Sequence, residues 1–332
     1  MTRYRIIVAS ALVATAILAV ATLLCGSVDI PASEVADALI GKGASRVTWQ
    51  NIIVELRLPA TITAALAGMS LAVAGLLMQT AFDNPLAGPS ILGVATGASL
   101  GVAIVVMVAG ATTLSVLGGA LVGSFAIIAL LIGLSLVLRS TLMLLIVGIM
   151  IGYLASSAIS LINFFATEES IHAFVFWGLG TFSGVARADL PVFAPVCIVF
   201  ALAAFLMVKP LNAMLLGDRY AANLGVDVRR ARTMMLVIAG TLTAAVTAWC
   251  GPISFLGLAV PHVARMAINS SDHSRLLPAT VIFGLLFGLL TLWLSILPSQ
   301  TGTIPVNAIT PLLGVPVIVY IIIFRRRLNY FN

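Results

Sequence analysis

Charged residues are scarce in this sequence. Only 8% of its 332 residues are Asp, Glu, Lys or Arg, while 61% are hydrophobic and the mean hydropathy is +1.18. Soluble domains carry about a quarter of their residues as charges. The chain therefore has too few polar side chains to cover a water-exposed globule, and its composition predicts an integral membrane protein.

Several motifs that would carry chemistry are also missing. The sequence contains no Walker A pattern, so the chain cannot bind ATP through a P-loop of its own. It contains no H-E-x-x-H, and its three histidines are scattered, so a metal site is not expected. Cys25, Cys197 and Cys250 lie in apolar surroundings and are interpreted as small buried hydrophobes without disulfides. The net charge of +6 is not gathered into a basic stripe, so nucleic acid is not an expected partner.

The hydrophobic residues fall into runs that are long enough to be membrane helices. They predict an all-α integral membrane protein with about ten transmembrane helices and one transmembrane domain over residues 1–332. The expected spans are roughly 6–25, 59–82, 91–109, 114–138, 141–165, 190–208, 231–250, 253–269, 278–297 and 305–324. The first resembles a signal peptide, but Ile6–Leu24 is long enough to be a retained span, with cleavage as the alternative. The eighth is the weakest, because it is short and contains Pro261, His262 and Arg265.

The charged residues between these runs predict an orientation. With an even number of spans and both termini in the cytoplasm, most of the basic residues fall on the inside, among them Arg3, Arg139 and Arg325–Arg327. Most of the acidic residues fall outside. The expected spans have no carboxylate at their centre, which disfavours an ion-coupled secondary carrier, although unwound backbone can also coordinate an ion.

A polar segment, residues 209–232, interrupts the apolar pattern on the predicted cytoplasmic side. Its sequence KPLNAMLLGDRYAANLGVDVRRAR predicts a helix from Pro210, a break at Gly217, a second short helix and an end at Gly225. Ala221, Ala222 and Gly225 are small enough for close docking on a partner, with Asp218 and Arg219 at the rim of the contact. The pattern alone is also compatible with an ordinary solvated loop.

The stretch GASLG at residues 97–101 matches the pattern of a nucleophile elbow around Ser99. It lies in a helical run in which Gly93, Gly97 and Gly101 recur every four residues, so we expect close helix packing rather than catalysis. Gly180/Gly184 and Gly284/Gly288 have the same spacing, and we expect the same role for them.

Four blocks of the sequence resemble the ABC importer permeases for vitamin B12, haem and iron-siderophores. The first is residues 57–101, with its Arg57-Leu58-Pro59, Gly68, Gly75, Gln79, Asn84-Pro85-Leu86-Ala87, Pro89 and Ile91-Leu92-Gly93. The others are GPISFLGLAVPHVAR (251–265), DHSRLLP (272–278) and IPVNAITPLLGVPVIVYII (304–322). The resemblance as a whole extends over nearly the whole chain.

The resemblance implies a vitamin B12-permease-like bundle in the bacterial cytoplasmic (inner) membrane. It implies a homodimer, two cytoplasmic ATP-binding subunits that hold ATP and Mg²⁺, and an extracytoplasmic substrate-binding protein. This chain would hold no cofactor and catalyse no reaction, and the cargo would be an iron chelate, haem or cobalamin. The segment 209–230 would couple to the ATPase through Leu216, Gly217, Asp218, Arg219, Tyr220, Ala221, Ala222, Asn223, Leu224 and Gly225. A secondary carrier, and an intramembrane enzyme using Ser99, are the alternatives.

The sequence departs from the family pattern at its outer face. Ala60 stands where the family often has an arginine, and the ninth span has no aspartate or arginine. Arg57 is then expected to project outwards and dock the binding protein, helped by Arg46 or Arg187, with membrane snorkelling as the alternative role. The translocation path is expected to include Met150, Ser160, Asn163 and Thr167, which could equally be packing residues.

Overall fold

The structure is a computed structural model that describes residues 2–89, 93–110, 113–138, 140–297 and 302–324. Within these ranges the chain forms helices and connecting turns and contains no strand. Some of the residues named above lie outside these ranges, namely Ile91, Leu92, Arg139 and Arg325–Arg327.

Helices occupy all ten of the expected apolar segments. They are α1 (Thr2–Leu24), α4 (Leu58–Ala81), α5 (Val94–Ile104) with η2 (Val105–Gly110), α6 (Thr113–Val137), α7 (Thr141–Phe165), α9 (Leu190–Phe205), α12 (Val228–Cys250), α13 (Leu256–Ile268), α14 (His273–Ile296) and α15 (Val306–Phe324). By length and composition, six helices of the described chain can cross a bilayer, and α9 with α10 (Val208–Met214) forms a seventh candidate bent by 54°. Three shorter apolar helices account for the remaining segments.

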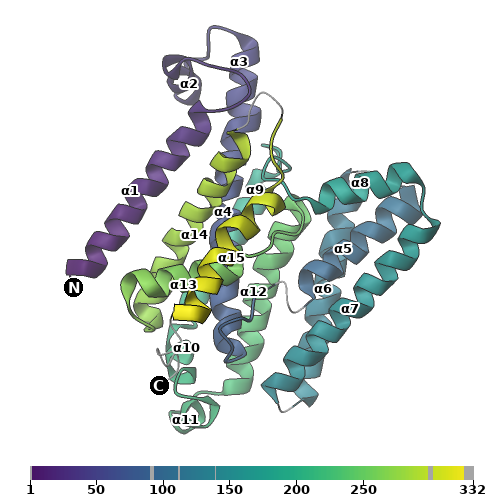
Figure 1. Cartoon of the computed structure of the whole chain (residues 1–332), viewed down its shortest axis with the longest axis vertical. Helices are drawn as coiled ribbons and strands as arrows, with labels where there is room; N and C mark the ends of the chain where they lie inside the picture. Colours follow the sequence, from purple (N-terminus) through teal and green to yellow (C-terminus); the bar gives the residue numbers. More distant parts are fainter. Residues whose placement is uncertain (1, 90–92, 111–112, 139, 298–301, 325–332) are drawn as a thin grey trace.

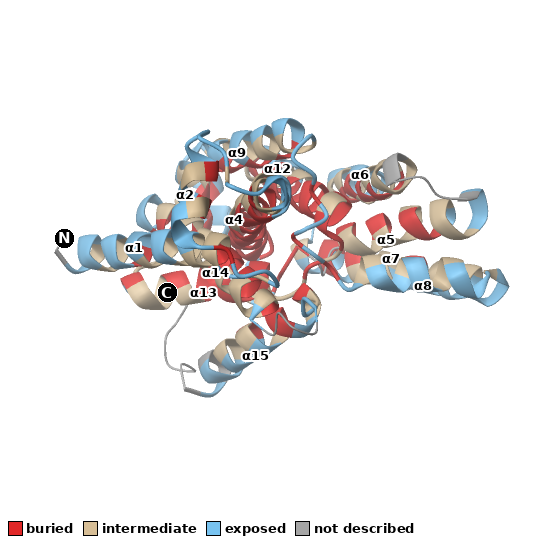
Figure 2. Ribbon diagram, turned by 90° about the horizontal axis from the view of Figure 1, so that it is seen from above, coloured by how far each residue is buried: buried red, intermediate tan, exposed pale blue. Residues whose placement is uncertain are grey.

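Helix α4 is the centre of the bundle. Most of its residues are buried, and it packs against α14, α12, α13 and α9 (Figure 2). Gly68 makes the approach to α14 possible, because a Cβ there would lie only 2.7 Å from the Cα of Gly288. Gly284 and Gly288 face α4 in turn, so their expected packing role is confirmed. Small residues of this kind bring membrane helices into backbone contact, where dispersion forces replace the hydrophobic effect.

The GASLG stretch packs in the same way against α6. A Cβ on Gly97 would lie 2.6 Å from the carbonyl oxygen of Gly123, and Gly101 lies against Gly119. Ser99 Oγ donates to the carbonyl of Ala95 at 3.0 Å within the helix. The strand-to-helix turn of a nucleophile elbow is not present here, so this stretch is helix packing. Helices α5 to α8 gather on one side of the bundle (Figure 1).

Three helices were not expected from the sequence. They are α2 (Ala32–Leu39), α3 (Val47–Asn51) leading through the π-helical η1 (Ile52–Arg57) into α4, and α8 (Glu168–Gly178). The second span does not begin at Pro59 as expected, because a continuous helix runs from Val47 to Ala81 and Pro59 lies in the first turn of its α4 part. The expectation that Gly180 and Gly184 take part in helix packing from one face of a helix is also wrong. Both lie in the loop after α8, and Gly180 has a φ of 74°.

The eighth expected span is only partly helical. After α12 the chain is non-helical through residues 251–255, with positive φ angles at Gly251 and Phe255, before α13 begins. Asn307 at the start of α15 stabilises this break. Its amide nitrogen donates to the carbonyl of Pro252, and its amide oxygen accepts from the backbone of Ser254 at 3.1 Å. Such bonds are required because lipid cannot satisfy unpaired backbone groups.

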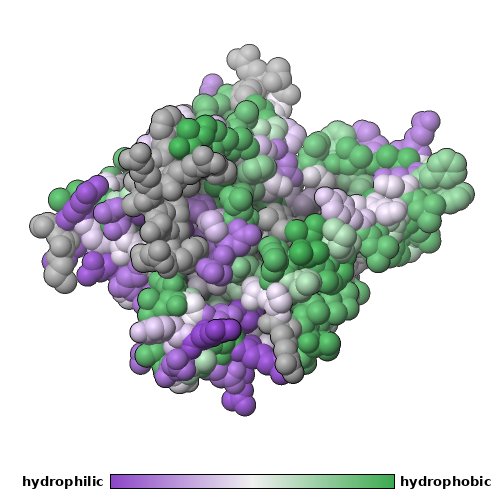
Figure 3. All heavy atoms as spheres, turned by 60° about the horizontal axis from the view of Figure 1, so that its bottom comes forward, coloured by the Kyte–Doolittle hydropathy of each residue, from purple (hydrophilic) through white to green (hydrophobic). Residues whose placement is uncertain are grey.

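The two ends of the bundle carry different elements. Helices α2, α3 and α8 lie at one end, whereas α10 and α11 (Asp218–Asn223) lie at the other (Figure 1). Viewed with this second end forward, hydrophilic side chains gather there, whereas hydrophobic ones cover the flank on the right (Figure 3). The polar segment 209–232, which the sequence predicts to be cytoplasmic, lies at this second end.

Candidate functional site

The polar segment between α9 and α12 has the architecture that its sequence predicts. Helix α10 ends at Met214, Gly217 has a φ of 94°, α11 follows, and Gly225 has a φ of 83°. Residues with side chains rarely adopt these angles, so the two glycines fix where the short helix begins and ends. We call residues 209–230 the coupling segment, and it projects from the lower end of the bundle (Figure 1).

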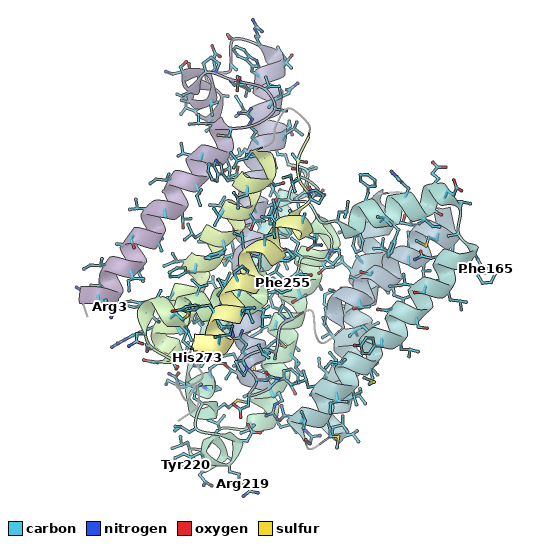
Figure 4. The ribbon with its side chains drawn as sticks, in the orientation of Figure 1. Arg3, Phe165, Arg219, Tyr220, Phe255 and His273 are labelled. Carbon is cyan, nitrogen blue, oxygen red and sulfur yellow. The ribbon has the colours of Figure 1, made fainter. Side chains whose placement is uncertain are left out.

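Three large apolar side chains of the coupling segment are exposed. Leu216, Tyr220 and Leu224 are 61%, 60% and 61% accessible. Tyr220 on α11 and Leu224 at its C-cap are four residues apart and lie on one side of that helix, whereas Leu216 precedes the break at Gly217. Tyr220 and Arg219 point away from the bundle at its lower end (Figure 4). We call Leu216, Tyr220 and Leu224 the apolar edge; exposed apolar groups at a polar end of a protein mark interaction sites.

Ala221 does not belong to this outward surface, and the expectation that it docks on a partner is wrong. It is fully buried within its own chain, and its carbonyl accepts from the backbone of Val226 at 3.0 Å. A helix that lies against the bundle must turn one side inwards, and the small side chain of Ala221 occupies that side. Ala222 and Gly225, in contrast, are exposed.

An ion pair ties α11 to the bundle. Asp218 Oδ2 lies 2.8 Å from Nη2 of Arg232, near the start of α12. Arg232 Nε also donates to the carbonyl of Ala81, the last residue of α4, at 2.9 Å. The Arg232 side chain is only 15% exposed, so this pair is better shielded from solvent than an ordinary surface pair. Displacement of α11 would therefore pull on α12 and α4 together.

A second connection joins α10 to α14. Asn212 donates to Asp272 at 2.8 Å, and its amide oxygen accepts from the backbone and from Nδ1 of His273 at 2.8 and 3.0 Å. His273 Nε2 lies 3.1 Å from Thr80 Oγ1 on α4. Because an amide oxygen only accepts, Nδ1 carries the proton. His273, which Figure 4 labels, thus connects the coupling segment to two core helices.

Arg57 is not the outward-facing group that the sequence suggested. It is only 8% exposed, and its Nη1 donates to the carbonyls of Leu23 and Leu24 at 2.9 Å each, while Nη2 donates to Val28. The carbonyls in the last turn of a helix have no partner within that helix. Arg57 therefore caps α1. Gly26 makes room for it, because a Cβ there would lie 2.7 Å from the guanidinium.

Other charges occupy the exposed outer surface. Arg187 forms a 2.8 Å ion pair with Glu55, and the two side chains are 58% and 51% exposed. Arg46 lies over the ring of Trp49, with 4.7 Å to the ring centroid. The sequence predicted that Arg46 or Arg187 assists Arg57 in docking. Both of these arginines are accessible to a partner, whereas Arg57 is buried.

Three of the four expected path residues lie along α7, and the fourth lies just beyond its end. Met150 and Ser160 are exposed on α7, and Asn163 lies near its end with a buried amide oxygen that has no hydrogen bond within the described chain. Thr167 lies beyond α7, where it accepts from the backbone of Ser170 as the N-cap of α8. The capping threonine followed by Glu168 and Glu169 was the sequence signal for α8.

Comparison with known proteins extends these observations to the whole chain. The profile of the FecCD transport family matches residues 13–324. The hemin transport system permease protein HmuU of Yersinia pestis is 31% identical over 310 residues, 92% of each chain. The vitamin B12 import system permease protein BtuC of Klebsiella pneumoniae is 32% identical over 290 residues, 83% of this chain and 84% of that one.

A solved structure agrees with the same assignment. An inward-facing conformation of a metal-chelate type ABC transporter superimposes with a TM-score of 0.84 at 27% identity, covering 96% of this chain and 99% of that one. The overall fold of this chain is thus shared with that transporter. This chain belongs to the FecCD transport family of ABC importer permeases.

Proposed function

We propose that this chain is the membrane subunit of an ATP-driven importer in the bacterial inner membrane. Two copies form the translocation path, and each carries an ATP-binding subunit on its coupling segment. ATP and Mg²⁺ are bound by those partner subunits. A substrate-binding protein delivers the cargo at the opposite end of the bundle.

The apolar edge carries this proposal. Leu216, Tyr220 and Leu224 are exposed at the polar end, where a soluble partner covers them better than lipid does. Arg219 and Ala222 are exposed beside them and supply a polar and a small contact. If a groove on the ATP-binding subunit accepts Tyr220, burial of its apolar ring would stabilise the complex by about 2 kcal/mol.

The ion pair and hydrogen bonds that join the coupling segment to the bundle would transmit movement of the docked partner to the membrane helices. ATP-driven closure of the partner subunits would displace α11, and the Asp218–Arg232 pair would carry that displacement to α12 and to the end of α4. Asn212 and His273 would carry it to α14. Because α4 is the buried centre of the bundle and packs against α9, α12, α13 and α14, its movement would reach those helices directly.

At the opposite end, the exposed Arg187 and Arg46 are the better candidates for docking the binding protein. Their guanidinium groups can meet carboxylates in bidentate geometry. Arg57 supports that surface from within, by holding the end of α1.

Helices α7 and α15 would form the contact between the two copies and line the translocation path. Both helices expose large apolar side chains, including Leu154 and Phe164 on α7 and Leu312 on α15. Met150, Ser160 and Asn163 on α7 would line the path between the two copies, with Thr167 near its outer end. The cargo is haem, cobalamin or an iron chelate, in keeping with the names of the relatives.

The proposal is tested by measuring how much ATP-binding subunit co-purifies with the permease. Tyr220→Ala should reduce it severalfold, because the substitution removes the aromatic ring at the centre of the apolar edge. Tyr153→Ala, which removes a similarly exposed tyrosine from α7, should leave it unchanged. Full co-purification of the Tyr220→Ala variant would contradict docking at this edge.

A further inference from the structure

A second surface feature includes the last residues of the coupling segment, where the end of α6 meets the start of α12. A cleft of about 720 Å³ opens there. Two arginines, one aspartate, one threonine and two apolar side chains line it: Leu136, Asp227, Arg229, Arg230, Thr233 and Met234. We propose that this cleft binds the headgroup of an anionic phospholipid from the cytoplasmic leaflet.

The charge of the cleft favours an anion. Arg229 donates through Nη2 to the carbonyl of Leu136 in the last turn of α6, which holds its guanidinium at the wall. Arg230 is 86% exposed, and its Nε lies 3.1 Å from Asp227 Oδ2. Two guanidinium groups face one carboxylate, so the lining has a net positive charge. Each guanidinium retains N–H donors in a planar arrangement that matches phosphate oxygens.

The other half of the cleft is apolar and continues along the membrane helices. Met234 and Val237 are 48% and 36% exposed, three residues apart on one side of α12. Leu136 and Val137, at the end of α6, are 54% and 78% exposed. Helices α6 and α12 are both long and apolar enough to span the bilayer, and they pack against each other. The arginines thus stand at the boundary between polar and apolar surface.

This arrangement matches a lipid better than a protein. A phospholipid places a negative phosphate beside the arginines and its acyl chains along Met234 and Val237. A soluble ATP-binding subunit can reach the arginines but not the apolar wall within the span. Basic pockets between membrane helices on the cytoplasmic side are typical headgroup sites.

The test uses the full-length chain purified with its co-purifying subunits, and it titrates phosphatidylglycerol and phosphatidylcholine separately by native mass spectrometry. We expect tighter binding of phosphatidylglycerol. Arg230→Gln should weaken it about fivefold, since one arginine near the surface is worth about 1 kcal/mol, and should leave phosphatidylcholine unchanged. Arg230 is suited to substitution because its side chain is so exposed that the fold does not depend on it.

Arg275→Gln is the matched control, because Arg275 is exposed at the start of α14 and does not line the cleft. It should bind phosphatidylglycerol as the unmodified chain does. Equal affinity of the unmodified chain for both lipids would overturn the proposal. An equal loss in both variants would also do so, because the effect would then come from net charge. If Arg230→Gln kept its phosphatidylglycerol but lost the ATP-binding subunit, the cleft would be a protein contact.

Discussion

At the scale of single residues, the same residue type does different work depending on what surrounds it. Arg57 and Arg187 were both expected near the outer surface, yet Arg57 is buried against three carbonyls while Arg187 is exposed in an ion pair. The sequence shows the arginine and the nearby Gly26, but not that α1 ends close enough for its carbonyls to be capped. That closeness depends on how α1 packs against α4 and α14, which no local pattern reports.

Removing the Arg57 side chain should destabilise the fold. Arg57→Met would remove the donor to the partly buried carbonyls of Leu23 and Leu24, and the penalty of about 1–3 kcal/mol for a fully buried unsatisfied group is the upper bound of the loss. Arg187→Gln should cost far less, because an exposed ion pair contributes about 0.2–1 kcal/mol. Thermal unfolding in detergent compares the two. A Tm of Arg57→Met no lower than that of Arg187→Gln would contradict the capping role.

Asp272 should make a pH-dependent contribution at the cytoplasmic end. Hydrogen bonds from the side chain and backbone of Ser274, followed by one from Asn212, hold the pKa of its carboxyl below its ordinary value. Because the folded pKa is lowered, the stabilisation is fully present above the unfolded pKa and is lost as the pH falls through the folded pKa. Thermal unfolding of Asp272→Ala near neutral pH should show a loss of about 0.5–2 kcal/mol, as expected for a lost helix cap.

The difference in Tm between the unmodified chain and the Asp272→Ala variant should become smaller at acidic pH. When the carboxyl of Asp272 is protonated, the unmodified chain loses the charge that strengthens these hydrogen bonds, so its stability advantage over the variant becomes smaller. A difference between the two Tm values that stayed constant down to strongly acidic pH would show that the carboxylate charge contributes nothing.

At the scale of elements, helices were predictable and the faces they bury were not. Apolar runs predicted ten segments because a bilayer forces the backbone into helices of a minimum length. The glycines at 217 and 225 predicted the limits of α11, because their backbone conformation is local. The inward side of α11 was missed, since Ala221 and Ala222 are adjacent alanines that only tertiary packing distinguishes. Helix α8 could have been found from its capping threonine and acidic first turn.

These two alanines provide a matched pair. Ala221→Trp should destabilise the chain by about 1–3 kcal/mol, because the indole has no room beneath α11. Ala222→Trp should leave the Tm unchanged, since its side chain is exposed, but should reduce ATPase stimulation by the docked permease. Equal Tm values for the two variants would show that α11 is oriented differently.

At the scale of the whole molecule, the core helix α4 is connected to the coupling segment at one end of the bundle through Arg232 and Asp218. Composition predicted the membrane, the missing P-loop predicted an external source of energy, and the resemblance predicted the family that the comparisons confirm. The connections through Arg232 and His273 could not be predicted, because they join residues that are far apart in the sequence.

The central claim is that ATP hydrolysis on partner subunits drives this chain through the coupling segment. The most direct measurement is cargo uptake into proteoliposomes containing the permease and its ATP-binding subunits, supplied with binding protein and with ATP on the cytoplasmic side. We expect ATP-dependent uptake that Asp218→Ala reduces severalfold, because this change breaks the link from α11 to Arg232, while ATP hydrolysis continues. Uptake driven by an ion gradient without ATP, and unaffected by Asp218→Ala, would contradict it.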